Sequence, residues 1–163
     1  MDFTFAAYQI ADLATEIEEA SVSFYNQMSK NASEDRVKDL FTALSAFESE
    51  HIITFRGMSC DLKNDSPIYL YPINLAQLIK EHVSKIKSVF DSKVFSGLEL
   101  DTKESLQIAI EAEETSIRIY SDIQANISEQ FIKIFDRIIS EERQHLTMLL
   151  TVKDKVCPPE KRF

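Results

Sequence analysis

Two Glu-x-x-His pairs carry the clearest chemical signal in the sequence: Glu48 with His51, and Glu142 with His145. Residues three apart on a helix project from the same face, so each carboxylate lies beside its imidazole. Each pair also interrupts an apolar stripe with heptad spacing, which is typical of a helix that faces a bundle core. Such groups are costly in a core unless they are paired or bind a metal. The two stripes are Val37, Phe41, Leu44, Glu48, His51, Phe55 and Phe131, Phe135, Ile138, Glu142, His145, Leu149.

Two further stripes of the same spacing each carry a single glutamate at the centre, Glu18 in one and Glu113 in the other. Small residues one turn away on either side leave room beside each carboxylate. The pattern predicts four glutamates and two histidines that face one another inside a bundle. These stripes are Ala11, Ala14, Glu18, Ser21, Tyr25, Met28 and Leu106, Ala109, Glu113, Ser116, Tyr120, Ile123.

This set of side chains suits two divalent metal ions, because four carboxylates balance the four positive charges. Hard oxygen donors with one imidazole per metal favour iron or manganese over zinc. The glutamates beside the histidines, Glu48 and Glu142, can bridge the two metals, and Glu18 and Glu113 can cap them from the facing helices. We therefore expect two Fe ions, with Mn or a mixed pair as the alternative.

The elements that must position these residues are two helical hairpins that look like copies of each other. Glu18 to Tyr25 aligns with Glu113 to Tyr120 at an offset of 95, and both Glu-x-x-His pairs align at an offset of 94. An internal repeat of this kind predicts an all-α, pseudo-twofold four-helix bundle. We expect one domain over 1–163, with hairpin 1 at about 3–57 (helices 3–30 and 34–57), a crossover at 58–101, and hairpin 2 at 102–153 (helices 102–126 and 129–153).

The crossover is long enough to run the full height of the bundle, which would make the second and third main helices parallel. Its sequence predicts an amphipathic helix at roughly 74–92, on which we expect His82 to be partly exposed. Ser33 and Ser128 are the expected N-caps of the second and fourth helices, and Asp101 or Thr102 that of the third.

Composition restricts the classes of partner. The net charge of −9 argues against nucleic acid or an anionic membrane surface, which require a basic face. We expect no membrane span and no signal peptide, because no apolar run is long enough. The two cysteines, Cys60 and Cys157, are isolated and predicted to be inert thiols, and the expected location is the cytoplasm.

The Glu-x-x-Ser-x-x-Phe-Tyr motif that begins at Glu18, its echo at Glu113 and the two Glu-x-x-His pairs together resemble the ferritin-like superfamily, and most of all the rubrerythrin-type di-iron domains. The resemblance implies a ferritin-like bundle that reduces peroxide or O2, or oxidises Fe(II), with an external electron donor and as a homodimer. It also implies six metal ligands and two tyrosines beside them. The implied metal ligands are Glu18, Glu48, His51, Glu113, Glu142 and His145, with Tyr25 and Tyr120 next to them.

Three departures from these families leave the activity open. Ile110 stands where peroxide-reducing rubrerythrins carry an extra glutamate, and the sequence has no Cys-x-x-Cys pair of a rubredoxin domain. Ile52 stands where bacterioferritins have their haem-ligating methionine, so we expect no haem. The alternatives are a non-catalytic iron-handling or metal-sensing protein, and a metal-free structural bundle. For Tyr25 and Tyr120 the alternative to a redox role is that of plain core aromatics. Glu19, Glu50, Glu114 and Glu141 fall beside the stripes and are expected to be solvated, or at most to touch the ligands from outside.

Overall fold

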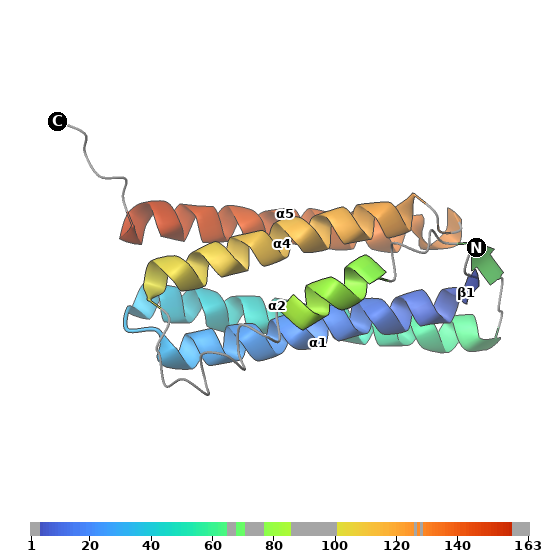
Figure 1. Ribbon diagram of the computed structural model, residues 1–163, viewed down its shortest axis with the longest axis horizontal. Helices are drawn as coiled ribbons and strands as arrows, with labels where there is room; N and C mark the ends of the chain where they lie inside the picture. The colour runs from blue at the N-terminus through green and yellow to red at the C-terminus, as the bar shows by residue number, and fades with distance from the viewer. Residues whose placement is uncertain are drawn as a thin grey trace.

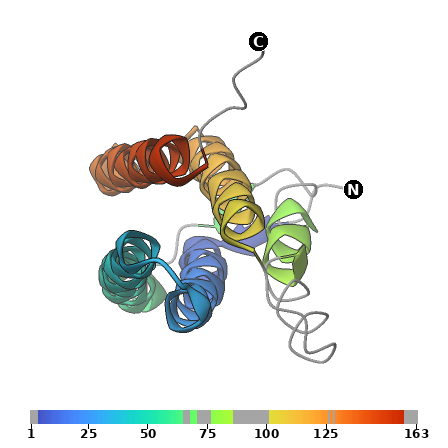
Figure 2. The same cartoon turned by 90° about the vertical axis from the view of Figure 1, so that its left-hand side faces the viewer.

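Four long helices make up most of the computed structural model, which describes residues 4–64, 68–70, 77–85, 101–125, 127 and 129–157. They are α1 (Ala7–Asn31), α2 (Asp35–Asn64), α4 (Thr102–Gln124) and α5 (Glu129–Val156). α1 and α2 form one antiparallel hairpin and α4 and α5 the other (Figure 1). The hairpins meet with α1 against α4 and α2 against α5 (Figure 2). The predicted all-α four-helix bundle is confirmed.

Figure 1 shows that α2 and α4 run in the same direction, as predicted, so the connection between the hairpins has to span the length of the bundle. Its described part is helical over residues 77–85 and lies beside α4. Lys85 Nζ is 3.2 Å from Glu111 Oε2 of α4, and this ion pair ties the crossover helix to the second hairpin. The ends of the helix predicted at 74–92 lie outside the described residues.

The helix boundaries differ most from the prediction at two places. α2 continues to Asn64 instead of ending near Gly57, because Met58 and Leu62 extend its buried apolar face by two more turns. α1 begins at Ala7, since Thr4–Ala6 forms a short strand, β1, that pairs antiparallel with β2 (Ile68–Leu70). This strand pair joins segments that are far apart in the sequence, and no local pattern predicted it.

Side chains and backbone groups at the helix ends account for two of the observed starts. Asp101 is the N-cap of α4, and its side chain accepts a hydrogen bond of 2.7 Å from the backbone N–H of Glu104. The first helical hydrogen bond of α2 runs from Lys38 N to Glu34 O at 3.0 Å, which places Glu34, and not Ser33, at its N-cap. The cap predicted at Ser128 lies outside the described residues.

The four predicted stripes form the interior of the bundle. Every position of the stripes on α1, α2 and α4 is buried, and so is every position on α5 except Phe131, which is half-buried at the end of the bundle. The heptad spacing therefore gave the correct rotation of each helix about its own axis. The polar stripe residues lie near the middle of each helix, with apolar layers on both sides of them.

Candidate metal centre

The six residues predicted as metal ligands lie together in the interior of the bundle, and all six side chains are buried. Every main helix contributes at least one of them, so the site depends on both hairpins. Their ligand atoms form two sets, each with its atoms within 4.8 Å of one another. The first set is Glu18 (α1), Glu48 and His51 (α2) and Glu142 (α5), and the second is Glu48, Glu113 (α4), Glu142 and His145 (α5).

Glu48 and Glu142 belong to both sets. Glu48 Oε2 lies 2.9 Å from His51 Nδ1, and its Oε1 lies 3.2 Å from His145 Nδ1. Glu142 does the same, with Oε1 at 3.1 Å from His51 Nδ1 and Oε2 at 3.4 Å from His145 Nδ1. Each carboxylate thus presents one oxygen to each half of the site, which is the arrangement needed to bridge two cations.

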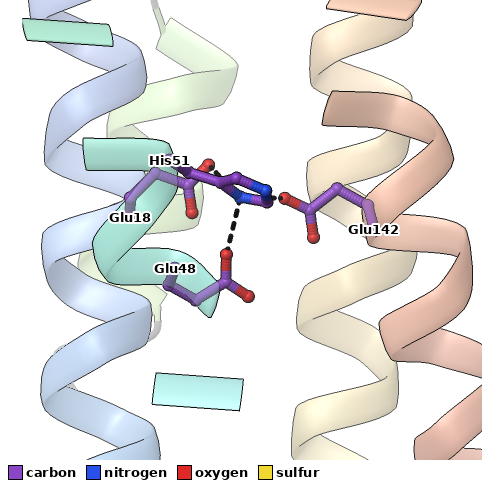
Figure 3. A group of neighbouring side chains, drawn as sticks. All are labelled: Glu18, Glu48, His51 and Glu142. Carbon is purple, nitrogen blue, oxygen red and sulfur yellow. Dashed lines mark ion pairs between the residues drawn. The ribbon is translucent and has the colours of Figure 1, made fainter. Parts of the chain in front are cut away.

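Figure 3 shows how the first set is assembled from three helices. Glu142 extends from α5 toward His51, which belongs to the other hairpin. Glu18 approaches His51 from α1, with its Oε1 at 3.6 Å from His51 Nδ1. The set therefore exists only when the two hairpins are docked.

The two remaining glutamates are each held by a tyrosine from the other hairpin. The Tyr25 hydroxyl of α1 donates a hydrogen bond to Glu113 Oε1 of α4, and the Tyr120 hydroxyl of α4 donates one to Glu18 Oε1 of α1. Glu113 keeps its second oxygen toward the cluster, with Oε2 at 3.8 Å from His145 Nδ1. The two tyrosines thus orient the outer carboxylates and connect the hairpins across the site.

A model of the rubrerythrin family matches residues 9–153, a span that holds the whole cluster. The chain belongs to the rubrerythrin family. No curated protein and no solved structure matches the chain. Membership of the rubrerythrin family confirms the resemblance that the motifs indicated, and it implies a ferritin-like domain with a di-iron site.

The polar atoms of this rubrerythrin cluster fit such a metal pair. Five buried ligand atoms have no hydrogen-bond partner among the described residues, although buried polar atoms in proteins are nearly always paired. His51 Nδ1 faces oxygens of Glu18, Glu48 and Glu142 at once, and a single N–H could donate to only one of them. A cation accepts lone pairs from all of these atoms together. The five atoms are Glu48 Oε2, His51 Nδ1, Glu113 Oε2, Glu142 Oε1 and His145 Nδ1.

Without a metal, protons on the histidines must balance the carboxylates. Burial lowers the pKa of His145, but the nearby carboxylates of Glu142 and Glu48, at 3.4 and 3.2 Å from Nδ1, outweigh burial and raise this pKa from 6.5 to about 9. Burial also lowers the pKa of His51, and contacts with the surrounding carboxylates outweigh it and bring the pKa far above its usual range. A metal must displace these protons, because only the neutral nitrogen has a lone pair to donate.

The pKa values of the buried glutamates shift in opposite directions. Burial, helped by repulsion from neighbouring carboxylates, raises the pKa of Glu18 and of Glu113 well above the ordinary value. Burial would also raise the pKa of Glu142, but its close contacts with Glu113 and both histidines outweigh burial and lower it. In the metal-free rubrerythrin site the surroundings therefore favour the charged form of Glu142 and disfavour the charged forms of Glu18 and Glu113.

Two aromatic clusters adjoin the outer carboxylates of the site. Each is centred on one of the two tyrosines, and each holds a phenylalanine at repeat-related positions, Phe41 and Phe135. Burial, then the nearby carboxylates, raise the pKa of Tyr25 and Tyr120 well above its ordinary value, so both phenols keep their protons and remain donors. The clusters are Phe24, Tyr25 and Phe41 on one side, and Phe55, Tyr120 and Phe135 on the other.

A cavity of about 280 Å³ opens between α2 and α5 and reaches both histidines. This volume is below the range of sites for drug-sized ligands and suits a small molecule. The cavity provides a path to the cluster that does not pass through the aromatic layers. Its lining residues are Phe47, Glu50, His51, Glu141, Gln144, His145 and Met148.

The prediction that His82 is partly exposed is wrong. His82 is buried, because the apolar face of the crossover helix packs on α4, where His82 Nε2 lies 3.3 Å from Ser116 Oγ. Burial, with the positive charges of Lys85 and Arg118, lowers the pKa of His82 to about 4, so this side chain is neutral at pH 7. It belongs to neither set of ligand atoms.

Glu141 touches the cluster from outside, which was one of the two alternatives for this residue. Its Oε2 lies 2.9 Å from His51 Nε2, the nitrogen that faces away from the cluster. The stacking of Phe47 on the ring of His145 was not predicted at all. The repeat contained a signal for both, since Phe47 and Glu141 are the residues that precede the two Glu-x-x-His pairs.

Two further expectations concern the cysteines and a membrane-spanning helix. Cys60 is exposed and Cys157 is half-buried, and the structure describes no disulfide at either position. No helix in the described ranges has both the length and the apolar character that a membrane crossing requires.

Proposed function

We propose that this chain is a di-iron carboxylate oxidoreductase that reduces peroxide or O2, or oxidises Fe(II), with Glu18, Glu48, His51, Glu113, Glu142 and His145 as the metal ligands. One observation carries the proposal: two sets of buried ligand atoms share Glu48 and Glu142, each of which aims one oxygen at each half of the site. A structural bundle has no use for five buried polar atoms without hydrogen-bond partners.

Iron is the proposed metal because each half-site offers carboxylate oxygens and a single imidazole, with Mn or a mixed pair as the alternative. A bound pair of ferrous ions supplies two electrons, one from each ion, which is the number that reduction of H2O2 and two protons to two waters consumes. A further cycle then needs an external electron donor. The small-molecule partners proposed are peroxide, O2 and Fe(II).

The protein residues have three tasks in this proposal. The cavity between α2 and α5 admits a small oxidant to the histidine side of the cluster. The aromatic clusters around Tyr25 and Tyr120 exclude bulk water from the other sides. The two phenols keep their protons at neutral pH and hold Glu113 and Glu18 by hydrogen bonds.

A second candidate, a non-catalytic iron-handling or metal-sensing protein, is favoured by one residue. Ile110 is buried one turn before Glu113, at the place of the extra glutamate of peroxide-reducing rubrerythrins. An isoleucine cannot bind metal or change its coordination during a cycle. The same six ligands could then bind iron that turns over slowly.

Anaerobic ferrous protein mixed separately with H2O2 and with O2 distinguishes these candidates. Much faster oxidation by H2O2 supports peroxide reduction, and rapid O2 uptake with many Fe(II) oxidised per chain supports ferroxidase activity. A single slow oxidation with either oxidant supports the iron-handling candidate. A metal content well below one ion per chain, in protein purified without chelator, would contradict both candidates. The Glu48→Gln/Glu142→Gln variant is the matched control and should bind little metal.

A further inference from the structure

The internal repeat allows the two halves of the cluster to be compared residue by residue. At an offset of 94, Glu48 corresponds to Glu142 and His51 to His145, so the histidine and bridging positions match. The residue before each Glu-x-x-His pair does not match: Phe47 on α2 corresponds to Glu141 on α5. Each of the two side chains contacts the histidine of the opposite hairpin, Glu141 at the outer nitrogen of His51 and Phe47 at the ring face of His145.

On the first side, Glu141 binds the outer nitrogen of His51 at 2.9 Å. The carboxylate is 39% exposed, and its other oxygen lies 3.9 Å from Arg137 Nε. A carboxylate on the outer nitrogen keeps the proton on Nε2, which leaves the Nδ1 lone pair directed into the cluster. It also increases the basicity of the ring and fixes the ring orientation.

On the second side, the ring of Phe47 stacks on His145, with centroids 5.2 Å apart and planes at 14°. None of the described residues forms a hydrogen bond with His145 Nε2. A stacked apolar ring restricts the orientation of the imidazole, but it neither selects the tautomer nor increases basicity. Phe47 is itself 42% exposed, at the edge of the cavity between α2 and α5.

We propose that the two metal positions differ in affinity, and that Glu141 is the positioning residue that causes the difference. The position at His51 binds metal tightly, and the position at His145, which lacks a carboxylate behind its histidine, binds weakly and exchanges. This inference rests on the proposed metal site. Loss of such an outer partner lowers metal affinity by about 10–100-fold, so we expect the two affinities to differ by about that factor.

The test is an anaerobic titration of the chelator-treated full chain with Fe(II), in competition with a chelator of known affinity. The wild type should bind two ions per chain in two separate steps. Glu141→Gln should weaken the tight step by about tenfold or more and leave the weak step unchanged. Phe47→Glu, which places a carboxylate at the repeat-related position, should strengthen the weak step only.

Glu50→Gln is the matched control, because Glu50 is an exposed glutamate that lines the same cavity. It removes the same charge without removing a described contact to either histidine, and both binding steps should stay as in the wild type. Two ions bound with equal affinity by the wild type would overturn the inference and leave the proposed function standing. Equal weakening of both steps by Glu141→Gln would also overturn it. A wild type that binds no iron would overturn both.

Discussion

Removal of the metal should destabilise the bundle, because five buried atoms would then lack a hydrogen-bond partner among the described residues. An unsatisfied buried polar group costs about 1–3 kcal/mol. Protons on His51 and His145 relieve part of this cost, so the low end of the range applies to each atom. The five atoms then cost about 5 kcal/mol in total, which is a large part of the roughly 5–15 kcal/mol that stabilises a typical domain.

This penalty translates into a large change of melting temperature. For a chain of this length, 1 kcal/mol corresponds to about 2–4 °C, so the metal-free protein should melt about 10–20 °C below the loaded protein. Circular dichroism melts of Fe(II)-loaded protein under anaerobic conditions, and of the same preparation after dialysis against a chelator, measure the difference. Metal content is determined on both samples.

The Glu48→Gln/Glu142→Gln variant is the control for this experiment. It removes both carboxylates that we propose as bridges and keeps the side-chain volume, so its melting temperature should be the same with and without iron. Loaded wild-type protein that contains two ions per chain and melts within about 2 °C of the chelated form would refute the assignment of the unpaired atoms to the metal.

Three further predictions concern individual side chains. The folded-state pKa of His145 is raised from 6.5 to about 9, so protonated His145 stabilises the metal-free protein fully below pH 6.5, and this stabilisation is lost as the pH rises to about 9. Urea unfolding that shows no fall of the free energy of unfolding across this window would contradict the prediction. The pKa of His82 shifts in the opposite direction, from 6.5 down to about 4, so the free energy of unfolding falls as the pH drops through this window. The fall is up to about 2 kcal/mol after allowance for partial solvation, and His82→Gln should remove it from acid unfolding curves. Tyr25→Phe removes the hydrogen bond to Glu113 and should weaken metal binding by about tenfold if the bond contributes about 1.4 kcal/mol. Competition with a chelator measures the affinity, and an unchanged affinity would mean that the phenol only fills space.

Much of the site could be predicted from the sequence because helix periodicity is a local property. The heptad spacing places Glu18, Glu48, Glu113 and Glu142 on inward faces without any knowledge of how the helices pack. The internal repeat then requires that the hairpins contribute equivalent faces. The buried stripes confirm this, and Phe131 is half-buried because it lies at the open end of the bundle.

The contacts between elements required the tertiary structure. Which tyrosine holds which glutamate, the burial of His82 and the strand pair of β1 and β2 all depend on how one segment is placed against another that is distant in the chain. The same holds for Glu141 and Phe47, which differ in sequence but whose contacts with His51 and His145 appear only when α2 and α5 are side by side. Spacing along one helix determines which residues face the interior, whereas the translation and rotation of the helices relative to one another determine which atoms meet there.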